Sequence, residues 1–166
     1  NGVSKAYCMT GWRLGYCGGP REIIAGMNKI QSQSTTSTSS ISMAASVEAL
    51  SGDQEFINLH NIQFKKRRDM VVKNLNQIDG INCLIPPGAF YVYPSCEGII
   101  GKKTSAGNTI NTDEDFMNFL LESEGIAGVH GEAFGLSPYF RLSYATDEKT
   151  LADACNRIER ACNNLK

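Results

Sequence analysis

The chain has 166 residues, a hydrophobic content of 42% and a formal net charge of −1 at pH 7. This length and composition are enough to bury one core, so we expect one domain, or one domain with a piece of another. A disordered chain is excluded. The near-neutral charge gives no electrostatic reason to expect nucleic acid or an anionic membrane as a partner. Small metabolites remain possible ligands.

A membrane span and a metal site are not expected either. The sequence holds no apolar run of about 18 residues and no signal-peptide profile at its N-terminus, so we expect a cytoplasmic protein. The cysteines are scattered, with no Cys-x-x-Cys pair and no histidines at metal-ligand spacing, which predicts free, mostly buried thiols. These cysteines are Cys8, Cys17, Cys83, Cys96, Cys155 and Cys162.

The start of the chain carries the clearest chemical pattern. Lys5 lies among small and polar residues close to Tyr7 and Trp12, and Arg13 follows eight positions later. A lysine amine that loses hydration beside aromatic rings becomes nucleophilic and suits Schiff-base formation, while a planar guanidinium suits a phosphate. An amine for an aldehyde and a guanidinium for a phosphate suggest pyridoxal phosphate. The alternative is a strand lysine with a surface arginine.

The surrounding strings make this pattern specific. Ser-Lys-Ala-Tyr at residues 4–7 and Met-Thr-Gly-Trp-Arg-Leu-Gly at residues 9–15 closely resemble the cofactor-lysine signature of the class I aminotransferases, which are fold-type I pyridoxal-phosphate enzymes. The resemblance implies that Lys5 forms the Schiff base with pyridoxal 5'-phosphate and then moves the proton. It also implies that Arg13 holds the cofactor phosphate, and that this chain, which starts inside the motif, is the C-terminal portion of a longer enzyme.

Residues 12–18 mix aromatic and aliphatic side chains and predict a buried strand that ends in a turn at Gly19 and Pro20. A helix follows, with apolar residues at helical intervals. These residues are Ile23, Ile24, Met27 and Ile30.

Residues 31–42 are rich in Ser and Thr and permit two interpretations. One is a flexible polar linker. The other follows from the resemblance, which implies a segment near the subunit interface whose Ser or Thr caps a helix at residues 41–50.

A long helical pattern runs from Asp53 to Ile78, and the resemblance makes it an interdomain helix. Its basic run at residues 65–68 points in all directions around a helix and lacks an aromatic platform, so we interpret it as solvated and not as a nucleic-acid site. His60 is interpreted as a helix-face residue rather than as a ligand.

Two short strands are predicted next, at residues 81–85 and 89–94. The second resembles the family strand that lines the substrate entrance, although core packing explains its aromatic residues equally well. Residues 98–104 lack the glycine spacing of a phosphate-binding loop, so we interpret residues 98–112 as a surface loop.

Thr112 or Asp113 can cap a helix that ends near Gly125. A strand and a glycine-rich loop follow, in which His130 replaces a proline that is usual in the family. His130 could reshape the loop or titrate near neutral pH, but we interpret it as a tolerated substitution.

Residues 139–145 alternate in the manner of a strand, with Phe140 and Leu142 on one face and Arg141 on the other. A buried arginine needs a partner. The string Phe-Arg-Leu-Ser-Tyr-Ala resembles the family signature in which this arginine binds the substrate α-carboxylate with two hydrogen bonds, and a structural salt bridge is the alternative. Asp147 is predicted to cap the last helix.

The resemblance implies an α/β fold class, namely the C-terminal part of a PLP-dependent transferase fold. Residues 1–52 would be the end of the large domain, residues 53–79 the interdomain helix and residues 80–166 the small α/β domain. The implied activity is transamination between an L-amino acid, with aspartate favoured, and 2-oxoglutarate in a homodimer. The alternatives are a transaminase for aromatic or other amino acids, and an inactive C-terminal fragment that only folds or dimerises.

Overall fold

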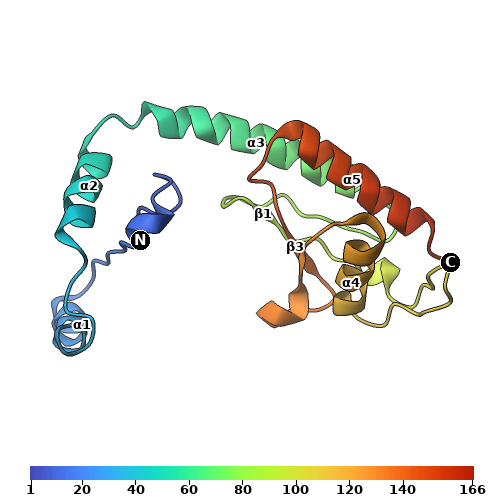
Figure 1. The fold of residues 1–166 in the computed structure, drawn as a ribbon, viewed down its shortest axis with the longest axis horizontal. Helices are drawn as coiled ribbons and strands as arrows, with labels where there is room; N and C mark the ends of the chain where they lie inside the picture. Colours follow the sequence, from blue (N-terminus) through green and yellow to red (C-terminus); the bar gives the residue numbers. More distant parts are fainter. The chain divides into compact units, whose positions relative to one another are not determined.

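The computed structural model describes residues 1–166 and divides into two compact units, residues 1–61 and residues 62–166. In Figure 1 the first unit runs from blue to cyan and the second continues through green to red. Helix α3 (Glu55–Leu75) begins in the first unit and continues in the second. None of the helices is both long and apolar enough to cross a membrane.

The first unit holds a 3-10 turn (Thr10–Trp12) and helices α1 (Arg21–Gln33) and α2 (Ser40–Ser51). Helix α1 starts directly after Pro20, whose carbonyl accepts the N–H groups of Ile23 and Ile24. Glu22 in the first turn adds a negative charge where the helix dipole favours one. The two helices predicted for this region are confirmed.

The predicted strand at residues 12–18 is wrong. Trp12 ends a 3-10 turn, and Arg13 adopts a left-handed backbone with φ 52°. An extended strand cannot pass through that conformation. The segment pairs with other backbone only through an isolated bridge between Gly2 and Gly15.

The predicted side-chain cap before α2 is also wrong. Ser39 occupies the capping position, but its hydroxyl accepts no hydrogen bond from the first turn. Its backbone carbonyl accepts the N–H of Met43, so the helix begins with main-chain bonding alone. On the buried side of α2, Ser46 donates its hydroxyl to the carbonyl of Ser42 at 2.7 Å.

The second unit is built around a small antiparallel sheet in the order β1-β3-β2. Its strands are β1 (Tyr91–Val92), β2 (Val129–His130) and β3 (Phe140–Ser143). Tyr91 pairs with Ser143, and Val129 pairs with Arg141, so β3 is the central strand. Residue Arg141 therefore lies between two neighbouring strands.

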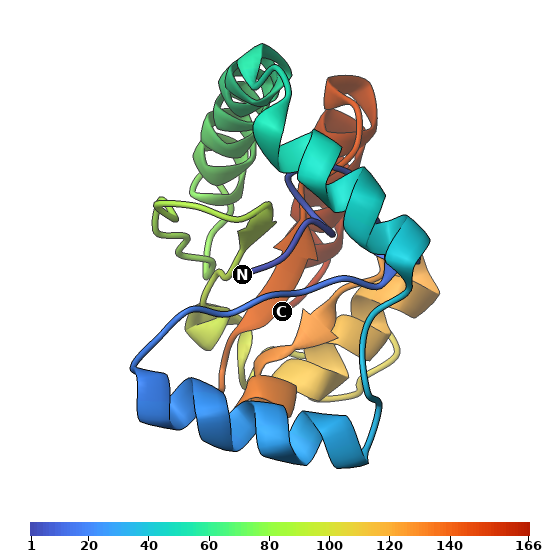
Figure 2. The same cartoon turned by 90° about the vertical axis from the view of Figure 1, so that its left-hand side faces the viewer.

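Helices α4 (Asp113–Glu124) and α5 (Glu148–Asn163) complete the second unit. Both views show α5 running beside the second half of α3 (Figures 1 and 2). An ion pair of 3.0 Å between Lys66 and Glu148 links these two helices. The core contains large side chains with no solvent exposure at all. They are Leu75, Val92, Cys96, Ile99, Phe116, Leu120 and Phe140.

The helix ends in this unit follow the sequence closely. Thr112 accepts the N–H of Asp115, and Asp115 accepts the N–H of Thr112 in return, which is a complete capping box. Gly125 ends α4 in the left-handed conformation that glycine adopts readily. Asp147 caps α5 by accepting the N–H of Thr150 at 2.9 Å. The predicted caps at Thr112 and Asp147 are confirmed.

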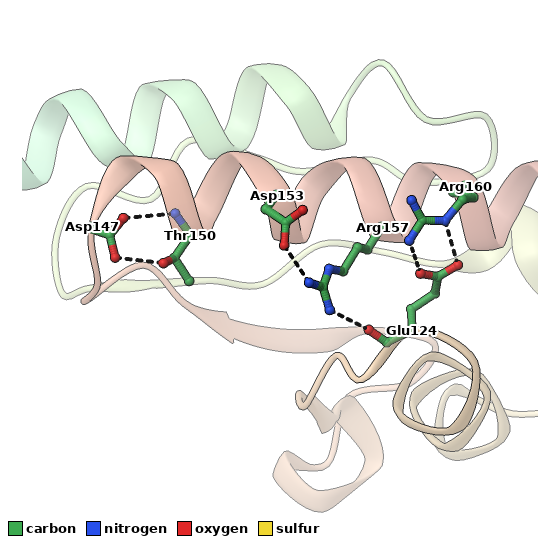
Figure 3. Close-up of polar contacts among 6 residues, drawn as sticks. All are labelled: Glu124, Asp147, Thr150, Asp153, Arg157 and Arg160. Carbon is green, nitrogen blue, oxygen red and sulfur yellow. Dashed lines mark hydrogen bonds and ion pairs between the residues drawn. The ribbon is translucent and has the colours of Figure 1, made fainter.

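Figure 3 shows polar contacts that join α4 to α5. Arg157 donates to the carbonyl of Glu124 at 3.2 Å and forms an ion pair of 2.8 Å with Asp153. Arg160 pairs with the Glu124 carboxylate through its Nε, at 3.0 Å, and through its Nη2. These bonds satisfy a terminal carbonyl of α4 that would otherwise lack a helical partner.

The predicted strand at residues 81–85 is wrong, and the one at residues 89–94 is reduced to Tyr91–Val92. Only an isolated bridge between Asn82 and Ser95 remains of the first. Prolines at positions 86, 87 and 94 have no N–H to donate to a ladder, so they shorten the pairing on both sides.

All six cysteines are free. Cys8 and Cys17 are exposed and the other four are buried, which confirms most of the prediction. Burial raises the pKa of the Cys83 thiol to about 11 and the pKa of the Cys96 thiol to about 12. These buried thiols are therefore protonated and unreactive near neutral pH.

Candidate active site

The segment that carries Lys5 forms a closed loop. The N-terminal amino group of Asn1 donates to the carbonyl of Tyr16 at 2.7 Å, and the N–H of Tyr16 donates back to the carbonyl of Asn1 at 2.8 Å. Within the loop, the Lys5 carbonyl accepts the N–H of Cys8 at 3.1 Å. The side chain of Lys5 is exposed. The loop therefore fixes the backbone of Lys5, and the residue lies at the surface.

Tyr7 ties this loop to the rest of the first unit. Its hydroxyl donates to the Gln54 side-chain carbonyl at 2.8 Å, and its ring meets the ring of Phe56 edge to face, with centroids 6.0 Å apart. Gln54 in turn donates its amide to the carbonyls of Ala49 and Gly52. The aromatic neighbour that the sequence placed near Lys5 thus anchors the loop.

Arg13 lies on the same loop. Its Nη1 donates to the carbonyl of Thr10 at 3.0 Å, and the residue is exposed. A guanidinium has five N–H donors, so most of its donors stay available for an anion. Lys5 and Arg13 both lie on the loop of residues 1–16, within the first unit.

Arg141 belongs to the second unit, where it lies half-buried on β3. Its guanidinium carbon lies 4.5 Å from the centre of the Tyr91 ring and 4.5 Å from the centre of the Phe134 ring. Both contacts are within the range of cation–π attraction. The partners of Arg141 within this chain are thus two aromatic rings. No carboxylate of the chain forms an ion pair with Arg141.

This packing suits a ligand with a carboxylate. Rings packed this close to the guanidinium restrict its movement, while its N–H groups point outward from the edge of its plane. A carboxylate binds at that edge with two parallel hydrogen bonds. The structural salt bridge considered from the sequence is not formed.

The sequence did not reveal the role of Phe134. This residue ends a 3-10 turn (Gly131–Phe134), and its ring also meets that of Tyr93 at 6.1 Å. Tyr93 lies parallel to Tyr139, with centroids 5.5 Å apart. Burial, followed by the negative charge of Asp113, raises the pKa of the Tyr93 hydroxyl. The signal in the sequence was an aromatic residue between Gly131 and Gly135 in a glycine-rich loop.

His130 does not distort this loop. Its backbone has φ −61° and ψ 149°, which are values that proline also adopts. The structure therefore agrees with a tolerated substitution. His130 pairs with Phe140 across the sheet as a regular member of β2.

The family model described as "Aminotransferase class I and II" matches residues 1–158. A relative from Rhizobium leguminosarum bv. phaseoli, named "Probable aspartate/prephenate aminotransferase", is 58% identical over the whole chain, and the alignment covers 42% of that relative. The "Aspartate aminotransferase" of Rhizobium meliloti (strain 1021) is 56% identical over 99% of the chain and is covered over 40% of its length.

Solved structures agree with these matches. The crystal structure of the aspartate aminotransferase from Rhizobium meliloti shares 55% identity over 100% of this chain and 42% of that one, with a TM-score of 0.95. An aromatic aminotransferase from Pyrococcus horikoshii shares 32% identity over 98% of this chain and 42% of that one, with a TM-score of 0.85. The predicted α/β class, as part of a PLP-dependent transferase fold, is confirmed. Because the family model covers residues 1–158 and the relatives match the chain from end to end, the chain belongs to the class I and II aminotransferase family.

Proposed function

We propose that this chain supplies Lys5, Arg13 and Arg141 to an aminotransferase that transfers the amino group of L-aspartate to 2-oxoglutarate. The observation that carries the proposal is the closed loop that presents Lys5 and Arg13 together, next to the signature strings in the sequence. Arg141, held between two rings, supplies the carboxylate site. The choice of aspartate rests on the names of the relatives. The chain spans about two fifths of the length of these relatives.

The residues present fit pyridoxal 5'-phosphate by their chemistry. Lys5 offers an accessible primary amine for the aldehyde, and Arg13 offers a guanidinium with spare donors for the phosphate. When bound, the cofactor supplies a ring that withdraws electrons from the substrate Cα. Lys5 and Arg13 are the residues of this chain that would hold it.

Each residue then has one task. Arg141 binds the α-carboxylate of the amino acid at the edge of its guanidinium and fixes the orientation of Cα. The Lys5 amine would take the proton from Cα and pass it on to the bound cofactor, and in the half-reaction with the keto acid it would carry a proton in the opposite direction. The exposed position of Lys5 on its loop gives the amine the access that these transfers require.

A second substrate pair is favoured by a specific observation. The Rhizobium leguminosarum relative carries prephenate as well as aspartate in its name. We therefore include prephenate as an amino acceptor to be measured beside 2-oxoglutarate. Transamination of aromatic amino acids is the third activity to compare, since an aromatic aminotransferase is among the similar structures.

We also propose that the protein works as a homodimer. Large apolar side chains on α1 and α2 are exposed in the single chain, among them Ile30 at 73% and Ile41 at 72%. Exposed apolar surface of this kind is typical of interfaces. The domain boundaries at residues 52 and 79, and a cytoplasmic location, stay predictions.

The test uses a protein of the relatives' length that contains this chain. After addition of pyridoxal phosphate and borohydride reduction, peptide mass spectrometry should find one stable adduct, on Lys5. Lys5→Ala should lower kcat by at least about a thousandfold, because both the proton carrier and the amine are lost. Lys29→Ala, an exposed lysine elsewhere in the first unit, is the matched control and should keep full activity.

The proposal fails if the adduct forms on another lysine, or if the Lys5→Ala variant retains turnover. A retained adduct at Lys5 with no transamination in any of the three reactions (aspartate with 2-oxoglutarate, aspartate with prephenate, and aromatic amino acids) would leave the cofactor assignment and reject the reaction. The inactive-fragment alternative is tested on the chain of residues 1–166 alone, which should show no transamination if residues outside it complete the site.

A further inference from the structure

We propose that Asp113 is a positioning residue for Arg141: its buried carboxylate ties both ends of the segment 132–139, and this holds Phe134 against one face of the guanidinium. The inference rests on the proposed function, because it concerns the residue that is assigned to the substrate carboxylate. Neither the signature strings nor the resemblance to aminotransferases pointed to it. The sequence presented Asp113 only as a possible helix cap.

Asp113 is a buried acid with an unusual set of partners. It is 1% exposed, and its Oδ2 accepts the backbone N–H of Glu132 at 3.1 Å and of Tyr139 at 3.3 Å. A buried carboxylate is costly unless hydrogen bonds and nearby positive dipoles compensate it. Asp113 is the first residue of α4, where the positive end of the helix dipole supplies part of this compensation.

The carboxylate is not used to cap its own helix. The capping box of α4 is formed by Thr112 and Asp115, and it satisfies the first turn without help from Asp113. Burying an additional acid beside a complete cap brings the helix nothing that the half-buried Asp115 does not already provide. The bonds of Asp113 run instead to a segment 19 and 26 residues away in the sequence.

Both bonded positions are adjacent to the arginine site. Glu132 lies two residues before Phe134, and Tyr139 lies two residues before Arg141. One oxygen atom therefore adds a second link between the turn that carries the ring and the strand that carries the guanidinium, beside the bond from the Gly131 N–H to the Tyr139 carbonyl at 2.7 Å. The ring of Phe134 lies 4.5 Å from the guanidinium carbon of Arg141 in this arrangement.

Contacts other than the two Asp113 hydrogen bonds also restrict the segment 132–139. Tyr93 donates its hydroxyl to the carbonyls of Gly131, at 3.1 Å, and Leu136, at 3.3 Å. A side chain at Gly131 would collide with the Leu136 carbonyl and lie 2.8 Å from that of Tyr139, so the turn admits only glycine there. The segment thus has few ways to relax, and losing the Asp113 carboxylate removes the acceptor of the Glu132 and Tyr139 N–H groups.

Loss of the Asp113 hydrogen bonds would affect Arg141 through the position of Phe134. If the turn moves, one aromatic face of the guanidinium is lost, and the arginine is held only by Tyr91 on the other side. The plane of the guanidinium is then less well fixed, and two parallel hydrogen bonds to a carboxylate are harder to form. Substrate binding should suffer, while the proton transfer assigned to Lys5 is not directly affected.

The test compares two acids of the same helix in a protein of the relatives' length that contains this chain. Asp113→Ala removes the clamp, whereas Asp115→Ala removes the carboxylate half of the capping box, which accepts the N–H groups of Asn111 and Thr112, and nothing from the segment 132–139. Asp113→Asn is the conservative variant, because its amide oxygen can still accept both N–H groups. KM and kcat are measured with aspartate and 2-oxoglutarate, and the Kd of succinate, a dicarboxylate that cannot react, is measured by calorimetry.

We expect Asp113→Ala to raise both KM values and the succinate Kd by about tenfold, with kcat changed by no more than about twofold. Asp113→Asn should restore most of the binding. Asp115→Ala should lower the denaturation midpoint and leave KM and Kd as in the parent protein. If Asp113→Ala does not fold, Asp113→Asn and Tyr93→Phe, which removes one hydroxyl, carry the same comparison with smaller increases in Kd.

Unchanged KM and Kd in folded Asp113→Ala would overturn the inference, as would unchanged values in both Asp113→Asn and Tyr93→Phe where Asp113→Ala does not fold. Equal effects of Asp113→Ala and Asp115→Ala would overturn it too. Arg141→Lys separates this failure from failure of the proposed function. If Arg141→Lys weakens succinate binding and Asp113→Ala does not, only the positioning role is wrong. If Arg141→Lys has no effect either, the carboxylate site itself is wrong and both proposals fall.

Discussion

At the scale of single residues, the arrangement around Arg141 separates two roles that the sequence could not. A strand arginine in apolar surroundings was expected to bind either a substrate carboxylate or a structural acid. The structure stacks it between Tyr91 and Phe134 and gives it no acid. Aromatic rings near the guanidinium stabilise its charge without using its N–H donors, which is compatible with the binding role proposed above.

Arg141→Lys tests this assignment. A lysine keeps the positive charge but has neither the planar fork nor the stacking faces, so KM for aspartate and 2-oxoglutarate should rise by about ten- to a hundredfold. Steady-state kinetics with both substrates measures the effect. Arg157→Lys on α5 is the control, because Arg157 contacts Asp153 and Glu124 and no part of the site. Equal kinetics for the two variants would show that Arg141 has a structural role.

At the scale of elements, the contact between α4 and α5 depends on charge. Glu124 at the end of α4 pairs with Arg160 of α5, as Figure 3 shows. The hydrogen bond from Arg160 is the main cause that holds the pKa of the Glu124 carboxyl below its ordinary value of 4.5. A carboxyl whose pKa is lower in the folded state stabilises the fold while it is ionised.

The pH dependence of the stability follows from the lowered pKa of Glu124. The contribution of Glu124 is complete above pH 4.5 and is lost as the pH falls through the lower folded-state pKa. Glu124→Gln should therefore lower the denaturation midpoint at pH 7 and have a shrinking effect below about pH 4. Urea titrations at several pH values, followed by the methyl signals of the buried Leu120, measure it. Glu122→Gln, an exposed acid on the same helix, should change nothing, and a constant deficit of Glu124→Gln at all pH values would contradict the ion-pair account.

At the scale of the whole molecule, the two units differ in how much core they possess. Nearly all buried apolar side chains belong to residues 62–166, whereas the first unit buries only Val3 and Met9 among its hydrophobic residues. Helix α1 has no buried residue. Since most helical stability in proteins comes from packing an apolar face, the helices of the two units should differ in stability.

Hydrogen exchange of the chain alone tests this difference. The amides of α4 and α5 should be strongly protected, because they open only when the core of the second unit opens. The amides of α1 and α2 should exchange at rates close to those of an unfolded peptide. Mass spectrometry of peptides from the four helices gives the comparison. Equal protection in all four would mean that the first unit is stabilised by interactions other than core burial.

The extent to which the sequence predicted this molecule varies with the kind of signal. Helix ends were predictable where a local residue fixes them, as Thr112, Gly125 and Asp147 do. Strands were predicted less well, because aromatic and β-branched residues mark where a strand can form, while prolines and partners decide how long it is. The segment at residues 12–18 shows the same weakness, since one left-handed residue, Arg13, interrupts an otherwise strand-like string.

The sequence by itself determined the family of this protein and the chemistry of its candidate site, because the lysine and arginine strings are local and a reactive side chain keeps its chemistry in any fold. The tertiary structure alone decided what surrounds Arg141. Phe134 and Tyr91 are far from each other in the sequence, and only the pairing of β1, β3 and β2 brings their rings to one guanidinium. The same holds for Asp113, whose buried bonds to Glu132 and Tyr139 depend on long-range packing that no local pattern encodes.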